Sequence, residues 1–150
     1  MNHIRIQSGD FDAAAEAAAL AHARPGIGAI VTFTGLCRDE GGTLAALELE
    51  HYPGMAEEEV SRVVAEAESR WDLKGVTVIH RHGKIEPGGQ IVLVVTASSH
   101  RADAFAAADF LMDYLKTRAP FWKKEHRKDG TTGEWVDAKE ADDRAAERWA

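Results

Sequence analysis

Residues 76–97 read VTVIHRHGKIEPGGQIVLVVTA and dominate the secondary-structure pattern of the chain. Two β-branched runs, VTVIHRHGKI and QIVLVVTA, flank the tetrapeptide EPGG. Proline and glycine favour a tight turn there, because proline presets one φ angle and glycine tolerates positive φ. The stretch therefore predicts two antiparallel strands joined by a short turn, around which the other elements should assemble.

The segments on either side of this hairpin include further strand patterns. Alternation of apolar and polar residues predicts a strand, and a near-continuous apolar run predicts a buried strand. We expect strands at residues 3–7 and 44–52, and a buried strand at residues 28–35. Further along, FWKKEHRK and GEWVDAK flank DGTT, which predicts a second hairpin.

Four helices are expected between these strands. Apolar spacing and capping residues predict helices after Asp10 and over residues 55–71, 101–118 and 141–149. Asp10 should cap the first helix, and Ser98 or Ser99 should cap the third. The order of elements predicts one α+β domain over residues 1–150, with the helices on one side of a mixed or antiparallel sheet.

The composition is that of an ordinary soluble globular protein. The chain has 150 residues, 45% of them hydrophobic and 29% charged, which suffices for a core without staples. No apolar run is long enough to cross a membrane, and the first residues lack a signal-peptide pattern. Its one cysteine, Cys37, excludes an internal disulfide and a CxxC motif. We expect a cytoplasmic protein without membrane contact.

One segment departs sharply from the acidic character of the chain. The whole protein has a formal charge of −7, yet residues 114–128, YLKTRAPFWKKEHRK, carry six basic side chains and one acidic one. Such a patch can receive an anion even on an acidic protein. Because side chains alternate along a strand, Phe121 and Lys123 should share one face, with Trp122 and Lys124 on the other.

Lys116 and Lys123 are the candidate chemical groups of this basic segment. A helix followed by a returning strand makes their meeting feasible, and each ammonium would then disfavour the charge of the other. A lysine with a lowered pKa can act as a nucleophile or proton-transfer group, whereas two protonated lysines would act as electrostatic clamps. Alternatively, Lys116 merely suits the negative end of a helix dipole.

A second candidate anion site is SSHR, residues 98–101, at the start of the third expected helix. Free N–H groups and the positive end of the dipole favour a phosphate or carboxylate there. His100 and Arg101 add side-chain donors, and arginine can hold an oxyanion with two hydrogen bonds. The alternative is a plain serine cap followed by solvent-facing residues.

The loop GLCRDEGG, after the strand expected at residues 28–35, offers less specific signals. Arg38 is another possible anion donor, although Asp39 and Glu40 can neutralise it. Arg38 could also lower the pKa of the Cys37 thiol, but no base can be assigned, so a structural cysteine is the favoured interpretation.

Two further kinds of site receive little support. His80 and His82 share a strand face, yet no third metal ligand has recognisable spacing, so we expect no metal site. Glycine-rich phosphate loops of the GxGxxG or Walker type are absent from the sequence.

Five stretches together resemble one known family. They are VTFTGLCR (31–38), LELEHYPGMAE (47–57), VTVIHRHGKIEPGG (76–89), SSHRADAF (98–105) and FLMDYLKTRAPFWKKE (110–125). With them, nearly the whole chain resembles the catalytic subunits of molybdopterin synthase, and the MDYLKTRAPFWK core is the most specific part. The resemblance implies an α/β hammerhead fold with an additional antiparallel β subdomain.

It also implies an activity and partners. The family installs the two dithiolene sulfurs that turn cyclic pyranopterin monophosphate into molybdopterin, in molybdenum cofactor biosynthesis. The sulfur arrives as a thiocarboxylate on the Gly-Gly C-terminus of a small ubiquitin-like subunit. The resemblance further implies a homodimer within a heterotetramer, and no cofactor.

The family's functional positions are carried over one residue at a time. The catalytic lysines fall on Lys116 and Lys123, which also contact substrate. The other implied substrate-binding residues are Leu36, Cys37, Arg38, His100, Arg101, Lys124 and Glu125. Cys37 would contribute its backbone, with no chemical role for the thiol. Phe33 and Met112 would wall the pterin pocket or belong to the core, and Lys139 would reach the site of a neighbouring protomer.

Two functions of other classes remain open from the residues alone. A noncatalytic adaptor would dock a ubiquitin-like tail in the basic groove and make no product. A nucleic-acid binder would stack bases on Phe121 and Trp122 between basic residues. We expect no nucleic-acid partner, because the acidic remainder of the chain repels polyanions.

Overall fold

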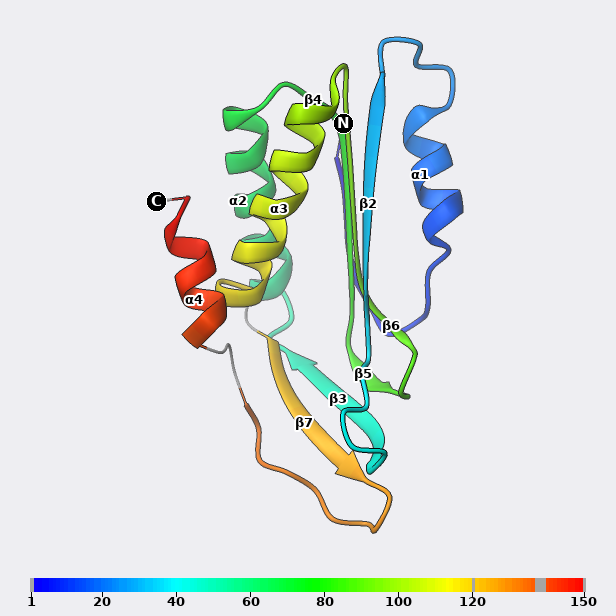
Figure 1. Ribbon diagram of the computed structural model, residues 1–150, viewed down its shortest axis with the longest axis vertical. Helices are drawn as coiled ribbons and strands as arrows, with labels where there is room; N and C mark the ends of the chain where they lie inside the picture. The colour runs from blue at the N-terminus through cyan, green and yellow to red at the C-terminus, as the bar shows by residue number, and fades with distance from the viewer. Residues whose placement is uncertain (1, 120, 137–139, 150) are drawn as a thin grey trace.

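The computed structural model describes residues 2–119, 121–136 and 140–149, drawn in Figure 1. The strands are β1 (Asn2–Gln7), β2 (Ala29–Leu36), β3 (Leu44–His51), β4 (Leu73–Arg81), β5 (Gly83–Ile85), β6 (Gln90–Ser98) and β7 (Phe121–Arg127). The helices are α1 (Ala13–Ala21), α2 (Met55–Arg70), α3 (Arg101–Thr117) and α4 (Glu140–Glu147). Helices and sheets together place the protein in the α+β class, as the sequence predicts.

A four-stranded sheet with the order β1-β4-β6-β2 forms the centre of the molecule. β4 and β6 pair antiparallel, with Val78 opposite Val94, so the predicted central hairpin is confirmed. β1 joins the outer side of β4 in parallel, and β2 joins β6 antiparallel.

The first arm of that hairpin differs from the prediction of one continuous strand. It breaks after Arg81, and Gly83 takes a φ of 90° before the short β5 begins. Glycine adopts this left-handed region without the steric penalty of other residues. β5 then leaves the central sheet and pairs with β3. One apolar run of sequence thus supplies strands to two sheets.

The second sheet has the order β5-β3-β7 and is antiparallel throughout. It lies beyond one end of the central sheet (Figure 1), and it confirms the predicted additional antiparallel unit. Its own small core contains Cys37, Leu44, Leu49 and Ile85, all buried. The predicted second hairpin is present only in part: residues 131–136 return along β7 through two isolated bridges, Lys123–Val136 and His126–Thr132.

The helices cover both faces of the central sheet, so the prediction that they share one side is wrong. Val76 and Val78 of β4 pack in a core with α2 and α3. Ile79, next along β4, packs with Leu20 of α1. Successive side chains of a strand point to opposite faces, and Figure 1 shows α1 across the sheet from α2 and α3. α4 packs on the outside of α3.

Strand β2 is an edge strand with intermediate and exposed residues, whereas its apolar sequence predicts a buried strand. Of the strands that the structure describes, only β6 borders it, and Phe33 retains 41% exposure. A near-continuous apolar run is typical of a strand that is covered on both faces. The run does not show whether the cover comes from the same chain or from a second one.

The capping predictions were displaced by a few residues. Asp12, rather than Asp10, caps α1 by accepting a hydrogen bond from the Ala15 amide at 3.0 Å. His100 is the N-cap residue of α3, while the two preceding serines donate to backbone carbonyls of other segments. Among the described residues, no helix is both long enough and apolar enough to cross a membrane.

Candidate active site

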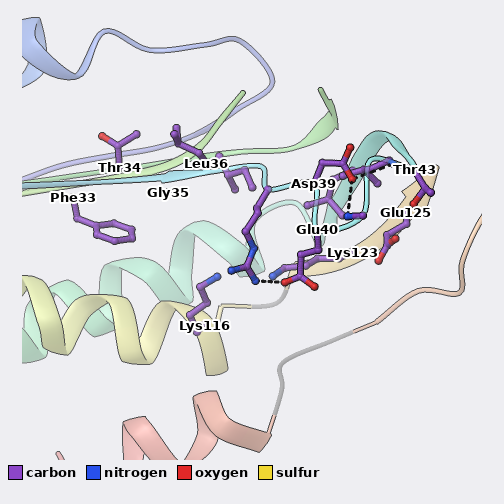
Figure 2. Close-up of a pocket in the computed structure, with 15 residues that line it drawn as sticks. Phe33, Thr34, Gly35, Leu36, Asp39, Glu40, Thr43, Lys116, Lys123 and Glu125 are labelled. Carbon is purple, nitrogen blue, oxygen red and sulfur yellow. Dashed lines mark hydrogen bonds and ion pairs between the residues drawn. The ribbon is translucent and has the colours of Figure 1, made fainter. Parts of the chain in front are cut away.

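A cavity of about 620 Å³ lies where the two sheets meet the end of α3 (Figure 2). Its walls come from β2, the loop after β2, β3, the last turn of α3 and β7, segments that are far apart in sequence. The described residues that line it are Phe33, Thr34, Gly35, Leu36, Arg38, Asp39, Glu40, Gly41, Thr43, Leu44, Leu47, Ile91, Lys116, Lys123 and Glu125. Five of the predicted site residues are thereby brought together: Leu36, Arg38, Lys116, Lys123 and Glu125.

Lys116 reaches the cavity from the last turn of α3. Leu111 and Leu115 are buried against the central sheet and fix the orientation of the helix. Lys116 is exposed and follows directly after them. The negative end of the helix dipole stabilises its ammonium, so the helix-end interpretation and the functional one are compatible.

Lys123 reaches the same cavity from β7. It lies opposite Leu49 of β3, and its backbone exchanges two hydrogen bonds of 2.8 Å with Val136 on the other side. Pairing on both sides fixes the backbone of Lys123. The side chain of Lys123 is half-buried. Figure 2 shows the side chains of Lys116 and Lys123 extending toward the same part of the cavity.

The alternation predicted for β7 explains what happens to the next residue. Lys124 is not among the described residues that line the cavity; its ammonium lies 5.3 Å from the centre of the Trp135 ring. Glu125, one residue further, returns to the cavity. Strand periodicity therefore separates Lys124 from the lysine pair while keeping Glu125 with it.

Arg38 contributes the third cation of the cavity, from the loop after β2. Its guanidinium pairs with the Glu40 carboxylate, which also lines the cavity (Figure 2). Asp39 accepts a hydrogen bond from the Leu44 amide at 3.3 Å and so ties the loop to β3. The cavity is consequently mixed in charge, because acidic side chains lie among its three cations. An entering anion must displace these acidic side chains or overcome their repulsion.

Cys37 does not take part in the cavity surface. Its side chain is buried in the small second core, and burial raises the pKa of the thiol. Its backbone is occupied as well, because its N–H donates to Gly89 and its C=O accepts from Gly88. The idea that Arg38 activates this thiol is therefore wrong, and Cys37 is a core residue.

His100 and Arg101 lie at the opposite end of α3 from Lys116. Both are exposed, and neither is among the described residues that line the lysine cavity. Fifteen residues of helix separate Arg101 from Lys116, or about 22 Å at 1.5 Å per residue. Within one chain, the two predicted anion sites are separate.

The remaining predicted positions divide between neighbouring sites. Phe33 lines the lysine cavity and also a smaller one, of about 340 Å³, which Met112 lines. Lys139 lies outside the described residues. No group of three potential metal ligands occurs within the described part of the chain.

Sequence reasoning missed the environment of His80. This residue was weighed only as a metal ligand, yet its ring is buried beside the lysine cavity and stacks on Phe121 at 3.7 Å between ring centres. Burial, followed by the positive charges of Lys116 and Lys123, lowers the pKa of His80 to about 4. Both lysines therefore act electrostatically on one buried ring.

Comparisons with known proteins give one consistent family for the chain. The profile of the MoaE protein family matches residues 6–118. A Mesorhizobium japonicum protein named molybdopterin synthase catalytic subunit is 68% identical over 146 residues, which cover 97% of this chain and 92% of the relative. The Escherichia coli (strain K12) protein of the same name is 54% identical over 124 residues, covering 81% of each chain.

Solved structures extend the likeness to three dimensions. The molybdopterin biosynthesis MoaE protein from Burkholderia ambifaria superposes with a TM-score of 0.85 at 53% identity, covering 99% of this chain and 98% of that one. Molybdopterin synthase from Staphylococcus aureus gives a TM-score of 0.79 at 28% identity, covering 87% of this chain and 94% of that one. On its sequence and its fold, the chain belongs to the MoaE protein family.

Proposed function

We propose that the protein is a sulfurtransferase, the catalytic subunit of a molybdopterin synthase. It converts cyclic pyranopterin monophosphate into molybdopterin in molybdenum cofactor biosynthesis. The sulfur comes from the C-terminal thiocarboxylate of a small ubiquitin-like subunit. The observation that carries this proposal is the convergence of Lys116, Lys123 and Arg38 on one cavity from three separate segments.

The cavity suits the two anions that this reaction must bring together. A pterin phosphate and a thiocarboxylate tail both carry negative charge, and two ammonium groups with a guanidinium can offset it. After the tail's sulfur has bonded to the pterin, water must attack the carbonyl carbon; negative charge then develops on the carbonyl oxygen, and it is lost again as the carbon–sulfur bond breaks and a carboxylate remains. A lysine ammonium fixed next to that oxygen stabilises the transition state more than the ground state.

We assign the two lysines different tasks. Lys116, exposed at the end of α3, acts on the terminal carbonyl of the entering tail as acid, base or charge stabiliser. Lys123 is half-buried, and its backbone is paired with β3 on one side and with Val136 on the other. It assists ring opening or handles the intermediate. Arg38, Leu36 and Glu125 bind substrate, and Arg38 exchanges its Glu40 partner for the substrate anion.

We further propose that residues 1–150 act as one domain within a homodimer, which two small subunits complete to a heterotetramer. His100 and Arg101 are too far from Lys116 to share its cavity in one chain. A second copy can supply them, and the exposed edge strand β2 with Phe33 leaves a face available for that copy. We propose that the reaction takes place in the cytoplasm.

Reconstitution tests the function directly. The purified protein, the thiocarboxylated carrier and cyclic pyranopterin monophosphate should together yield molybdopterin, and omission of the thiocarboxylate should abolish the product. Tight binding of the carrier tail without product would identify an adaptor instead and contradict the proposal.

A further inference from the structure

His80 lies at the point where the two sheets meet. It is near the end of β4, paired with Ile6 of β1 and Val92 of β6, and its side chain is buried. Its Nδ1 atom lies 2.8 Å from the backbone oxygen of Arg81. A carbonyl oxygen only accepts, so Nδ1 carries the hydrogen and donates it. The ring is thereby fixed in one orientation.

The ring of His80 connects this point to the strand that carries Lys123. It stacks on Phe121 with 3.7 Å between ring centres and 16° between ring planes. His51 of β3 lies on Phe121 as well, at 6.1 Å and 27°. Phe121 begins β7, and Lys123, two residues later, emerges on the same face of the strand. The stack therefore ties the first residues of β7 to the central sheet.

The charges around His80 exclude a role as a proton acceptor. Lys116 of α3, Lys123 of β7 and His51 of β3 all disfavour a positive charge on its ring, in addition to the larger effect of burial. An imidazole that takes a proton only near pH 4 is too weak a base to remove one from an ammonium group. At neutral pH the ring is uncharged, and it adds no third positive charge beside the two amines.

We propose that His80 is a positioning residue for the lysine pair: its ring, stacked on Phe121, holds the start of β7 so that Lys123 faces Lys116 across the cavity. The role deepens the proposed function, on which it depends for calling the lysines catalytic. Placement of the Lys123 amine is a property of the free protein, however, and can be measured without turnover.

Two substitutions separate the ring from its hydrogen bond. His80→Phe keeps an aromatic ring on Phe121 but loses the donor to Arg81, whereas His80→Asn keeps a donor and loses the stack. If the stack positions the site, His80→Phe should keep kcat within about 3-fold of the unchanged protein, and His80→Asn should lower kcat at least about 10-fold with little change in KM.

The amines are followed directly in the free protein. Lysines are dimethylated with ¹³C-formaldehyde, and the NMR signals of Lys116 and Lys123 are assigned from Lys116→Arg and Lys123→Arg variants. In His80→Phe the Lys123 signal and its pH titration should match those of the unchanged protein. In His80→Asn that signal should move toward the position of the exposed Lys84, while the Lys84 signal, assigned from a Lys84→Arg variant, stays in place.

Several results would overturn the proposal. An unchanged Lys123 signal in His80→Asn would show that the stack does not place this amine. Equal loss of kcat in both variants, in step with their loss of stability, would reduce His80 to a core residue. If turnover is absent from every variant and from the unchanged protein, the proposed function alone fails, and the NMR comparison still decides the positioning role.

A second pair of variants covers the case in which His80→Asn does not fold. Phe121 is only half-buried, so the stack can be weakened from its other side. Phe121→Leu should displace the Lys123 signal and lower kcat as His80→Asn does, and Phe121→Tyr should preserve both. If Phe121→Leu left the Lys123 signal and kcat unchanged, the positioning role would be wrong.

Discussion

At the scale of single residues, the proposed chemistry depends on two lysines held in different ways. Lys116 is exposed at a helix end, whereas Lys123 is half-buried in a strand paired on both sides. The difference matters because a charge-stabilising group must be placed before the reaction, and a fixed backbone reduces the cost of placing it. Arg38 is less fixed, since it lies on a loop and is paired with an exposed glutamate.

Replacement of Lys116 tests the catalytic assignment. Lys116→Ala should lower sulfur transfer by at least about 100-fold, the range typical of a lost acid–base or charge-stabilising group. Far-UV circular dichroism should be unchanged, because an exposed lysine at a helix end rarely supports the fold. Lys128→Ala, which removes another exposed lysine outside the cavity, is the matched control and should keep full activity. Near-normal turnover of Lys116→Ala would refute the assignment.

The buried His80 predicts a specific pH dependence of stability. Its pKa in the folded protein, about 4, lies below the ordinary value of 6.5 that it takes in the unfolded chain. As pH falls below 6.5, His80 therefore binds a proton in the unfolded chain but stays unprotonated in the folded protein. The stability linked to His80 is complete above pH 6.5 and is lost progressively toward pH 4.

Urea unfolding of the unchanged protein and of His80→Phe measures this linkage. Between pH 7 and pH 4.5 the unfolding free energy of the unchanged protein should fall by about 2 kcal/mol more than that of the variant. Because all other titrating groups are common to both proteins, the difference isolates His80. Parallel curves for the two proteins would show that its ring is not held neutral by burial.

At the scale of elements, the break between β4 and β5 controls the architecture of the site. One apolar run was expected to form a single strand, and its VTVIHR part does extend the central sheet. Gly83, with a φ of 90°, then redirects the chain so that β5 pairs with β3. Without that redirection, β3 would lose the neighbour on the side opposite β7.

An alanine at this position should be costly for conformational reasons alone. No atom lies within 4 Å of a Cβ built on Gly83, so the strain comes from its left-handed backbone. Gly83→Ala should lower the unfolding free energy by about 1–2 kcal/mol. Gly9 is equally open but lacks a left-handed φ, and Gly9→Ala should be neutral or slightly stabilising. Denaturant unfolding of both variants measures the difference, and equal effects would contradict the backbone argument.

The elements near the site show where local patterns succeed. Alternation along β7 correctly placed Lys123 on a different face from Lys124, because strand geometry is a property of the backbone itself. Helical spacing correctly identified the buried valines of α2. The patterns failed for β2, whose apolar sequence is equally suited to a central strand and to an edge strand that another surface covers.

At the scale of the whole molecule, the two predicted anion sites occupy opposite ends of α3. Lys116 lines the cavity, whereas Arg101 begins the helix about 22 Å away. If both serve one reaction, the residues must come from two chains of a symmetric dimer, in which each chain lends Arg101 to the cavity of its partner. This arrangement makes a prediction that no single-chain site shares.

Mixing of two impaired variants, assayed at a substrate concentration well below the KM of Arg101→Ala, distinguishes these cases. Arg101→Ala should weaken substrate binding by about 1–3 kcal/mol through a lost charged hydrogen bond. After unfolding and refolding together, Lys116→Ala and Arg101→Ala chains should regain up to about a quarter of the normal activity, because each mixed dimer has one cavity with both residues intact. Activity no greater than that of the separate variants would place both residues in one chain's site, or leave Arg101 outside it.

The sequence alone determined the class of the fold, the position of most elements and the identity of the cavity lysines. It could do so because strand alternation, helical spacing and turn chemistry are short-range properties of the backbone. The MDYLKTRAPFWK core added the family, which local physics does not supply.

Only the tertiary structure decided which residues meet. It assigned β5 to the second sheet, put helices on both faces of the first, and buried Cys37 away from the cavity. It also brought His80 within electrostatic range of Lys116 and Lys123, from a strand that ends 35 residues before the first of these lysines. Such contacts depend on how distant apolar faces pack together, and a pattern confined to neighbouring residues carries no information about that packing.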